Sequence, residues 1–550
     1  MNAMLQEFHN TLIQGLRRSS IQKTSKWAEM YRIMGQPFPG NYSFVHHPWT
    51  REMHDCDAEI MIGQKAAQLG FTEVALNKTF KAIDIDGKSV LYILPAATPD
   101  AGDFSKSRFD PALEMSPHLS KIFTSVQNIG HKRAGNANLF IRGSHSRSQL
   151  KSVPAALLVF DEVDEMSQEN ISLGLERSSG QFDKQAVFIS TPTISDFGIN
   201  TLFKASSQKH FMFQCPHCSR HTELIFPDCL TIIGEDYSDI AVLNSHLKCK
   251  ECKVKLDHET KSTWLADAHW VASYTNRISV GYYINQLYSM TLHPSDIAIS
   301  YLKGLTNPDD AQQLYNSKLG DVYTAPGAQI KDSDIDSCTK DYISFETYPK
   351  NAICTLGVDV GAQLHYSIEQ WFLKTSATAT SDINLLATPK LLKFGTLEHF
   401  EDLDVLMKDF HILYAVVDVN PETRKATEFA QRFFGRVSLC EYSMGVNHRQ
   451  LVEKDDCVIA VDRTSWLDLA LSRFKNQTIA LPQNTDLEYR NHIKALIRVT
   501  KLDKNGNPVA RYIKSEKLAD HFAHTRVYSE IAFPLAVKLA ENKSITERVI

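Results

Sequence analysis

The sequence has few cysteines, no long apolar run and no excess of positive charge. Its 550 residues include 10 cysteines, so a disulfide framework is not expected. No apolar run reaches the roughly 18–20 residues of a membrane-spanning helix, and residues 1–18 lack a continuous apolar signal core. A net charge of -5 excludes a global basic field, so any polyanion must be held by local patches. We therefore expect a cytoplasmic protein without a membrane partner.

The composition is that of an ordinary globular protein, with 43% hydrophobic and 22% charged residues. At roughly 100–200 residues per domain, the length predicts about three to four compact units. From residue 58 onward, short apolar runs alternate with helix-length stretches, which predicts an α/β domain with a mostly parallel sheet. The runs are Ala58–Ile62, Ser89–Leu94, Leu139–Arg142, Ala156–Phe160 and Ala186–Ser190.

A phosphate-binding loop is predicted after the first run, where a strand, a loop and a helix follow one another over residues 59–73. Gly70 and Thr72 fit the pattern G-x-x-x-x-G-K-[ST], but Lys65 stands at its first glycine and Phe71 at its lysine. Phosphate charge still needs a cation, so Lys65 is the expected substitute. Gln68, within the loop, joins the candidates for ATP binding. The alternative is a strand-to-helix turn with a surface lysine.

Two further strand ends support a nucleotide site. The run ending at Phe160 is followed by Asp161 and Glu162, which we assign to the Mg²⁺ ion and to the general base of phosphoryl transfer. The alternative is a solvated acidic strand end. The run ending at Ser190 is followed by Thr191, whose hydroxyl is placed to sense the γ-phosphate, although such polar strand ends are common.

The densest basic passage of this α/β domain comprises residues 131–133 and 142–148. It suits contact with a DNA backbone, or an arginine placed on the phosphates of a neighbouring subunit. A solvated loop is an equal alternative.

Two CxxC pairs, Cys215 with Cys218 and Cys249 with Cys252, stand 30 residues apart. Four thiolates in two short turns predict a tetrahedral Zn²⁺ site, with reactive cysteines as the alternative. Four sulfur ligands leave no open coordination position, so the zinc is expected to be structural.

The last part of the chain has two apolar strands that carry acids, Asp359 in residues 352–360 and Asp418 in residues 414–419. A carboxylate in a buried strand is costly unless it is paired or binds metal. Two such acids, with a third from a helix, form a site for two Mg²⁺ or Mn²⁺ ions that cleave phosphodiesters. Asp520 is the expected third ligand, and a helix N-cap is its alternative role.

Taken in order, these motifs resemble the large subunit of tailed-phage DNA-packaging terminases, in the lambda-like branch that carries a zinc-binding insertion. Further matching segments are Gly281–Tyr288, Tyr315–Gly320 and Gly357–Val360. The sequence departs from the family at Phe71, where a lysine is common, and at His524, where an acid is common.

The resemblance implies a P-loop (ASCE-type) ATPase domain with a zinc-ribbon insertion, followed by an RNase H-like nuclease domain. The expected segments are an N-terminal helical or loop segment (1–57), the ATPase domain (58–210), the four-cysteine module (211–275), a connecting region (276–345), the nuclease domain (346–535) and a C-terminal tail (536–550).

The implied function is that of a genome-packaging motor in the host cytoplasm. ATP hydrolysis would drive double-stranded DNA into a procapsid, and a metal-dependent endonuclease would cut concatemers. The implied partners are DNA, a small terminase subunit, the portal ring and further copies of the chain in a ring. The alternatives are a helicase-like translocating ATPase with an inactive RNase H-like clamp, and a non-catalytic zinc-ribbon DNA-binding protein.

Overall fold

The computed structural model describes residues 23–124, 126–151, 153–345, 352–373, 382–443, 445–446, 448–455, 457–502, 508–515 and 518–549. The chain divides between Tyr323 and Thr324 into two compact units, each with its own sheet and core. This division falls within the predicted connecting region, and the other predicted limits stay predictions. Residues 1–22 of the predicted N-terminal segment lie outside the described residues. None of the described helices is both long and apolar enough to cross a membrane.

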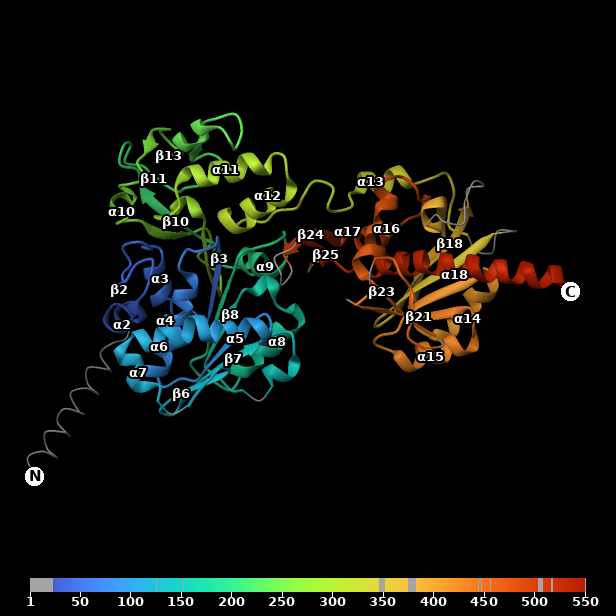
Figure 1. The fold of residues 1–550 in the computed structure, drawn as a ribbon, viewed down its shortest axis with the longest axis horizontal. Helices are drawn as coiled ribbons and strands as arrows, with labels where there is room; N and C mark the ends of the chain where they lie inside the picture. Colours follow the sequence, from blue (N-terminus) through green and yellow to red (C-terminus); the bar gives the residue numbers. More distant parts are fainter. Residues whose placement is uncertain are drawn as a thin grey trace, which may run out of the picture. The chain divides into compact units, whose positions relative to one another are not determined.

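An eleven-stranded sheet forms the centre of the first unit (Figure 1). Its strands are β3 (Ile60–Lys65), β4 (Val90–Leu94), β5 (Val126–Asn128), β6 (His131–Ala134), β7 (Ala137–Gly143), β8 (Leu157–Asp161), β9 (Gln185–Ser190), β10 (Lys209–Gln214), β11 (His221–Thr222), β15 (His269–Ala272) and β16 (Val280–Ile284). Their order is β11-β10-β16-β3-β9-β8-β4-β7-β6-β5, with β15 paired to β10. From β10 to β7 the strands pair in parallel.

Both faces of this sheet are buried, as the continuous apolar runs predict. In β4, the side chains of Val90, Tyr92 and Leu94 lie in one core cluster, and those of Leu91 and Ile93 lie in another. Each of the five predicted runs overlaps a parallel strand, namely β3, β4, β7, β8 or β9. The mixed α/β fold is therefore confirmed for this unit.

The helices of the first unit pack around the sheet, and Figure 1 shows α4 running along it. They are α2 (Thr24–Tyr31), α3 (Thr50–Asp55), α4 (Phe71–Asp84), α5 (Gly102–Phe104), α6 (Asp110–Met115), α7 (Pro117–Ile122), α8 (Gln168–Leu175), α9 (Gly198–Ala205), α10 (Lys261–Trp264), α11 (Pro294–Gly304) and α12 (Pro308–Gln313). A hairpin, β1 (Ile33–Met34) and β2 (Gly40–Asn41), encloses residues 35–39. A small sheet contains β12 (Leu230–Thr231), β13 (His246–Lys248) and β14 (Lys255–Leu256).

Two local expectations for this unit are wrong. The β-like sequence of residues 223–226 predicts a strand, but β11 ends at Thr222 and these residues are not a strand. Residues 281–285, predicted as connecting sequence, instead contribute β16, which pairs in parallel with β3. Gly281 has a packing role there, because a Cβ at this position would lie 1.9 Å from Ser206 Oγ. This glycine therefore allows close approach to a neighbouring segment.

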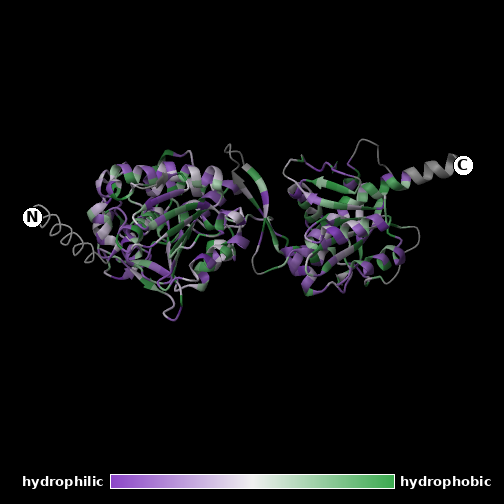
Figure 2. Cartoon of the chain, turned by 90° about the horizontal axis from the view of Figure 1, so that it is seen from below, coloured by the Kyte–Doolittle hydropathy of each residue, from purple (hydrophilic) through white to green (hydrophobic). Residues whose placement is uncertain are grey.

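The second unit is built on a seven-stranded sheet in the order β19-β18-β17-β20-β21-β23-β22. The strands are β17 (Ile353–Val360), β18 (Leu364–Leu373), β19 (Ala387–Leu397), β20 (Tyr414–Asp418), β21 (Val437–Tyr442), β22 (Val452–Glu453) and β23 (Val458–Val461), and a separate hairpin contains β24 (Leu496–Leu502) and β25 (Pro508–Lys514). Strands β17, β20, β21 and β23 pair in parallel, whereas β18 and β19 pair antiparallel. Figure 2 shows these strands mainly in the hydrophobic colour.

The helices of the second unit include a long C-terminal one, α18. They are α13 (Asp332–Cys338), α14 (Phe400–Asp409), α15 (Thr423–Arg432), α16 (Arg463–Lys475), α17 (Leu487–Lys494) and α18 (His521–Val549). Helix α18 packs across β17, β18 and β20. It continues as far as Val549, so residues 536–549 of the predicted C-terminal tail are helical.

Candidate functional sites

The predicted phosphate loop connects β3 to α4. Gly70, immediately before α4, has φ +82°, a left-handed conformation that a glycine adopts without strain. The N–H groups of Ala66 and Ala67 donate to the carbonyl oxygens of Ile284 and Ser317. The backbone donors available to a phosphate are therefore those of residues 68–72, at the start of the helix.

The segments of the later motifs hold this loop in place. Gly320, which has φ +62°, packs so closely that a Cβ would lie 2.5 Å from Ala66 N. Gln64 donates from Nε2 to the Gly320 carbonyl oxygen, and Asn200 Nδ2 donates to Gln64 Oε1. The sequence Tyr315–Gly320 thus contributes to the shape of the loop.

A cavity of about 940 Å³ opens over the loop. This volume is in the range of small-molecule sites in proteins. Six of the predicted residues line the cavity: Lys65, Gln68, Gly70, Thr72, Glu162 and Thr191. They come from the ends of β3, β8 and β9, three neighbouring parallel strands, and from the loop and first turn that begin α4. The carboxyl ends of such strands are a common position for ligand sites in α/β sheets.

Lys65 and the two acids of β8 form the charged part of this site. Lys65, a buried side chain, donates from Nζ to Glu162 Oε1 at 3.4 Å. Glu162 has φ +66°, which is uncommon for a residue other than glycine and is a form of strain found at functional sites. The structure therefore pairs the predicted lysine with the predicted base.

Asp161 lies behind Glu162 and is fully buried. Its Oδ2 accepts a hydrogen bond from Tyr92 Oη at 2.7 Å. Its Oδ1 has no hydrogen-bond partner among the described residues, a condition that suits a carboxylate supporting a metal ion through water. Burial raises the pKa of Asp161 to about 7; the charge of Glu162 adds to this shift and that of Lys65 opposes it.

Asp164 organises the segment that follows β9 and contains Thr191, a role that sequence reasoning missed. Its Oδ2 accepts hydrogen bonds from Thr193 N at 2.7 Å and Thr193 Oγ1 at 2.8 Å, and its Oδ1 accepts one from Ile199 N. Gly198 is tightly packed here, since a Cβ would lie 2.3 Å from Asp164 Oδ1. The acid run after β8 therefore connects Glu162, the predicted base, to the segment that contains Thr191.

Sequence reasoning also missed the aromatic side of the cavity and an arginine. Phe38 and His46 line the cavity, and their rings stack with centroids 3.8 Å apart. Arg108 lines the same cavity, and its charge lowers the pKa of Asp161. The Pro- and Gly-rich sequence of residues 35–40 predicts a loop, but nothing in the sequence places that loop beside residue 70.

The predicted basic passage has mixed surroundings. Lys132 is buried and pairs with Asp110 at 2.6 Å, while Arg142 donates to the carbonyl oxygens of Gly130 and Ile141. Arg147 is exposed. Contact with DNA or with a neighbouring subunit stays a prediction for this passage.

The four predicted cysteines converge, with all four sulfur atoms within 4.8 Å of one another. The two CxxC turns have the same local geometry. His217 N donates to Cys215 Sγ at 3.4 Å, and Glu251 N donates to Cys249 Sγ at 3.3 Å. These N–H groups stabilise negative sulfur, so the donor set fits a tetrahedral Zn²⁺ ion.

In the second unit, the acids of β17 and β20 lie side by side. The parallel register pairs Val358 with Val417, so Asp359 and Asp418 occupy the next positions of neighbouring strands. Asp418 accepts hydrogen bonds from Asn420 N and, at 3.0 Å, from Tyr528 Oη. Burial raises the pKa of Asp418, and the charge of Asp359 raises it further. Two adjacent acids of this kind suit divalent cations with oxygen ligands.

The side chain of Asp520, the expected third ligand, contacts other groups than the side chain of the next residue, His521. Its carboxylate contacts His524 Nε2 at 3.2 Å and Lys514 Nζ at 3.5 Å. Although burial raises the pKa of Asp520, His524 and Lys514 lower it well below its usual range. The side chain that contacts Asp359 is His521, at 2.7 Å from Nδ1 to Oδ2. The role of Asp520 as a metal ligand stays a prediction.

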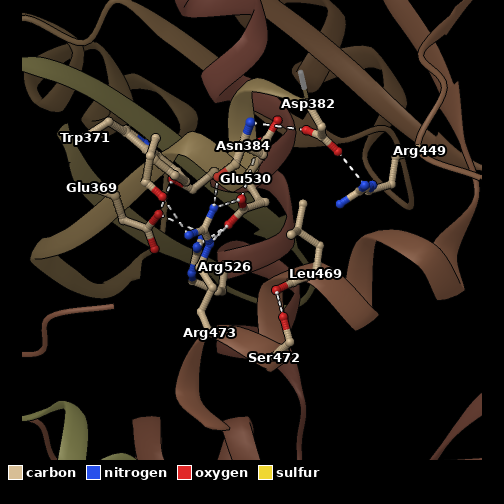
Figure 3. Close-up of polar contacts among 12 residues, drawn as sticks. Glu369, Trp371, Asp382, Asn384, Arg449, Leu469, Ser472, Arg473, Arg526 and Glu530 are labelled. Carbon is tan, nitrogen blue, oxygen red and sulfur yellow. Dashed lines mark hydrogen bonds and ion pairs between the residues drawn. The ribbon is translucent and has the colours of Figure 1, made fainter. Parts of the chain in front are cut away.

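Helix α18 is held against the sheet by small residues and by a buried ionic cluster. A Cβ on Gly357 would lie 2.0 Å from the Thr525 carbonyl oxygen, so glycine lets the helix approach β17. Figure 3 shows Arg526 between Glu369 and Glu530. Arg473 also pairs with Glu530. The cluster positions the first turn of α18, which contains His521.

Part of the first unit matches a known protein family. Residues 36–270 match the model of the "Phage terminase large subunit gpA, ATPase domain". No curated protein sequence matches the chain significantly. The structure is similar to the large terminase of bacteriophage HK97, with 12% identity, coverage of 94% of this chain and 100% of that one, and a TM-score of 0.52.

Two further solved structures are more distant. The large terminase ATPase domain of a Thermus phage is 12% identical and covers 49% of this chain and 91% of its own, with a TM-score of 0.30. The large terminase nuclease of thermophilic phage G20c with bound magnesium is 13% identical and covers 37% of this chain and 98% of its own, with a TM-score of 0.24. Of these three structures only the HK97 large terminase has a TM-score above 0.5, so the conclusion about the fold depends on it. Residues 36–270 are similar to the ATPase domain of phage terminase large subunits, and the chain as a whole has the fold of one of them.

Proposed function

We propose that the chain is the motor subunit of viral genome packaging. ATP hydrolysis drives translocation of double-stranded DNA into a procapsid, and a divalent-metal-dependent endonuclease in the second unit cuts concatemeric DNA. The observation that carries the proposal is the cavity over the phosphate loop, to which three separate strand ends contribute their predicted residues. The family match over residues 36–270 supports it.

In the ATPase unit, each residue has a role that follows from its position. Lys65 offsets phosphate charge, and the backbone of residues 68–72 binds phosphate oxygens, with Gln68 and Gly70 in the loop. Thr72 and Asp161 hold the Mg²⁺ ion, which neutralises charge that develops on the phosphates. Glu162 accepts a proton from the attacking water, and Thr191 responds to the γ-phosphate.

The rate at which the Glu162→Gln variant releases phosphate from ATP tests this assignment. We expect ATP turnover to fall by about 100-fold or more, because the amide cannot accept the proton, while nucleotide binding is retained. Lys65→Ala should lose both turnover and tight binding. The matched control is Glu169→Gln, an exposed acid in the first turn of α8. Unchanged turnover in Glu162→Gln would contradict the assignment.

In the second unit, we propose an RNase H-like nuclease in which Asp359 and Asp418 hold two Mg²⁺ or Mn²⁺ ions. Their adjacent positions on β17 and β20 support this role. The third ligand comes from the start of α18, where Asp520 and His521 are the candidates. Asp520→Asn and His521→Ala, compared for cleavage of supercoiled DNA, distinguish them: the variant that loses more activity identifies the ligand.

The helicase-like alternative predicts a different result. If the second unit is an inactive clamp, DNA stimulates ATP turnover, yet no cutting occurs with Mg²⁺ or Mn²⁺. Cleavage that is lost in Asp359→Asn supports the nuclease and argues against the clamp.

We also propose that Cys215, Cys218, Cys249 and Cys252 bind one structural Zn²⁺ ion. Cys215→Ser should release the ion and destabilise residues 211–275, measured by metal content and proteolysis. Full zinc occupancy in that variant would refute the site.

The proposed partners are double-stranded DNA, a small terminase subunit, the portal ring and further copies of this chain in a ring. The proposed location is the host cytoplasm. ATP turnover in the presence of DNA and purified procapsids tests the proposed DNA and portal partners.

A further inference from the structure

Three side chains with metal-binding chemistry converge in the second unit outside the proposed pair of aspartates. Glu488 and His492 lie four residues apart on α17, so both face the same side of the helix. His365 comes from β18. One ligand atom from each of the three lies within 4.8 Å of the other two. Glu488 Oε1 is 3.9 Å from His365 Nε2 and 4.0 Å from His492 Nε2.

These distances are too long for hydrogen bonds, which reach about 3.2 Å for a nitrogen donor. His365 and His492 are nonetheless buried, with exposed fractions of 7% and 6%. The Nε2 atoms of both histidines face Glu488 Oε1 without a hydrogen bond to it, so a group placed between the three side chains would satisfy these atoms.

A metal ion between the three side chains meets that need. Two imidazoles and one carboxylate form a ligand set that leaves open positions for water, and it suits transition metals. For a tetrahedral ion with bonds of about 2.0–2.1 Å, the ligand atoms come to about 3.3 Å from one another. Glu488 is able to close the remaining distance, because its side chain is 58% exposed and lies at the surface.

We propose that His365, Glu488 and His492 bind a transition-metal ion of the Zn²⁺ class, at a site distinct from the aspartate centre. The proposal does not rest on the nuclease function. The two sites adjoin, because His365 also lies with Asp359 and His521 in a second group of ligand atoms within 4.8 Å. Imidazole ligands favour Zn²⁺ over Mg²⁺, which prefers oxygen.

Calorimetric titration of the full chain with Zn²⁺ tests the site. The protein carries one zinc ion at its cysteines beforehand, and millimolar Mg²⁺ is present to occupy the aspartates. We expect one further zinc ion to bind. Glu488→Gln should weaken this binding by about 10-fold or more, and His492→Ala should abolish it. His399→Ala, an exposed histidine before α14, is the matched control and should bind as the wild type does.

Glu488→Gln alters an exposed side chain, so it keeps the test valid if His492→Ala fails to fold. Asp359→Asn separates this site from the nuclease centre and should retain the further zinc ion. The proposal is overturned if the wild type binds no further zinc, or if Glu488→Gln and His492→Ala both bind it at wild-type affinity. Loss in Asp359→Asn with retention in Glu488→Gln also overturns it, because the ion then belongs to Asp359, His365 and His521.

Discussion

Both units place acids at the carboxyl ends of parallel strands, but they compensate the charge differently. In the first unit, Glu162 faces Lys65 from the neighbouring part of the sheet. In the second, Asp359 and Asp418 lie next to each other on paired strands, and a histidine contacts the first of them. A lysine–acid pair is balanced within the chain, whereas two adjacent carboxylates gain stability from a bound cation.

The two units also differ in the groups that surround a buried basic side chain. Lys261, in the first unit, is almost completely buried and donates from Nζ to the carbonyl oxygens of Leu287 and Ser289. Arg526, in the second, is fully buried between Glu369 and Glu530. Neutral carbonyl groups compensate a cation less than carboxylates do, so the two sites respond differently to pH and to substitution.

The largest expected effect is on DNA cutting. Asp359→Asn and Asp418→Asn should each lower cleavage of supercoiled plasmid by about 1000-fold or more, because the two-ion site loses a charged ligand. The control is Asp402→Asn, an exposed acid in the first turn of α14. If both variants cut as fast as the wild type, the adjacent acids of the second unit are not a catalytic pair.

The next effect is on stability. Arg526→Met should lower the free energy of unfolding of the second unit by about 3–5 kcal/mol, because Glu369 is left buried without its cation. Urea denaturation measures this change. Arg424→Met, at a side chain that is 90% exposed, should cost less than about 0.5 kcal/mol. Equal losses in the two variants would mean that the ionic cluster does not hold α18.

A smaller effect is expected from Mg²⁺ without nucleotide. At about 100 times its dissociation constant, Mg²⁺ should stabilise the second unit by about 2.7 kcal/mol. The double variant Asp359→Asn, Asp418→Asn should lose this gain, as followed by thermal unfolding with and without EDTA. An undiminished gain in the double variant would place the ion elsewhere.

The smallest effect concerns pH. Burial lowers the pKa of Lys261 to about 7, below its usual value of about 10.4. Between these two pKa values Lys261 is protonated in the unfolded chain and neutral in the folded protein. The free energy of unfolding therefore rises with pH above 7 and falls as the pH is lowered towards 7. The stability difference between wild type and Lys261→Met should therefore shift in favour of wild type by about 1 kcal/mol per pH unit from pH 7 to 9. A difference that is constant with pH would show that Lys261 stays charged.

Much of the fold could be predicted because its signals are local. The apolar runs of β3, β4, β7, β8 and β9 are each visible in a few consecutive residues. The same reasoning failed for β16, which was predicted as connecting sequence, because its partner β3 lies more than 200 positions earlier. Strand pairing of that range depends on packing, which local sequence does not encode.

The candidate sites divide in the same manner. Lys65, Glu162 and the four cysteines could be predicted, since residue type and spacing express their chemistry directly. Asp164 could not be, because its role comes from contacts with Thr193 and with the start of α9. Phe38 and Arg108 were missed for a similar reason, as neither the loop that contains Phe38 nor the helical turn Ser105–Phe109 has a motif of its own.

The sequence by itself determined which strands end in acids, where the thiolates are paired and which loop precedes α4, because these are properties of short segments. Only the tertiary structure decided that His521 contacts Asp359 while Asp520 faces His524. It also brought His365 from β18 to Glu488 and His492 on α17. The physical reason is that a helix presents successive side chains in different directions, so its packing against a sheet selects which of them reaches a site.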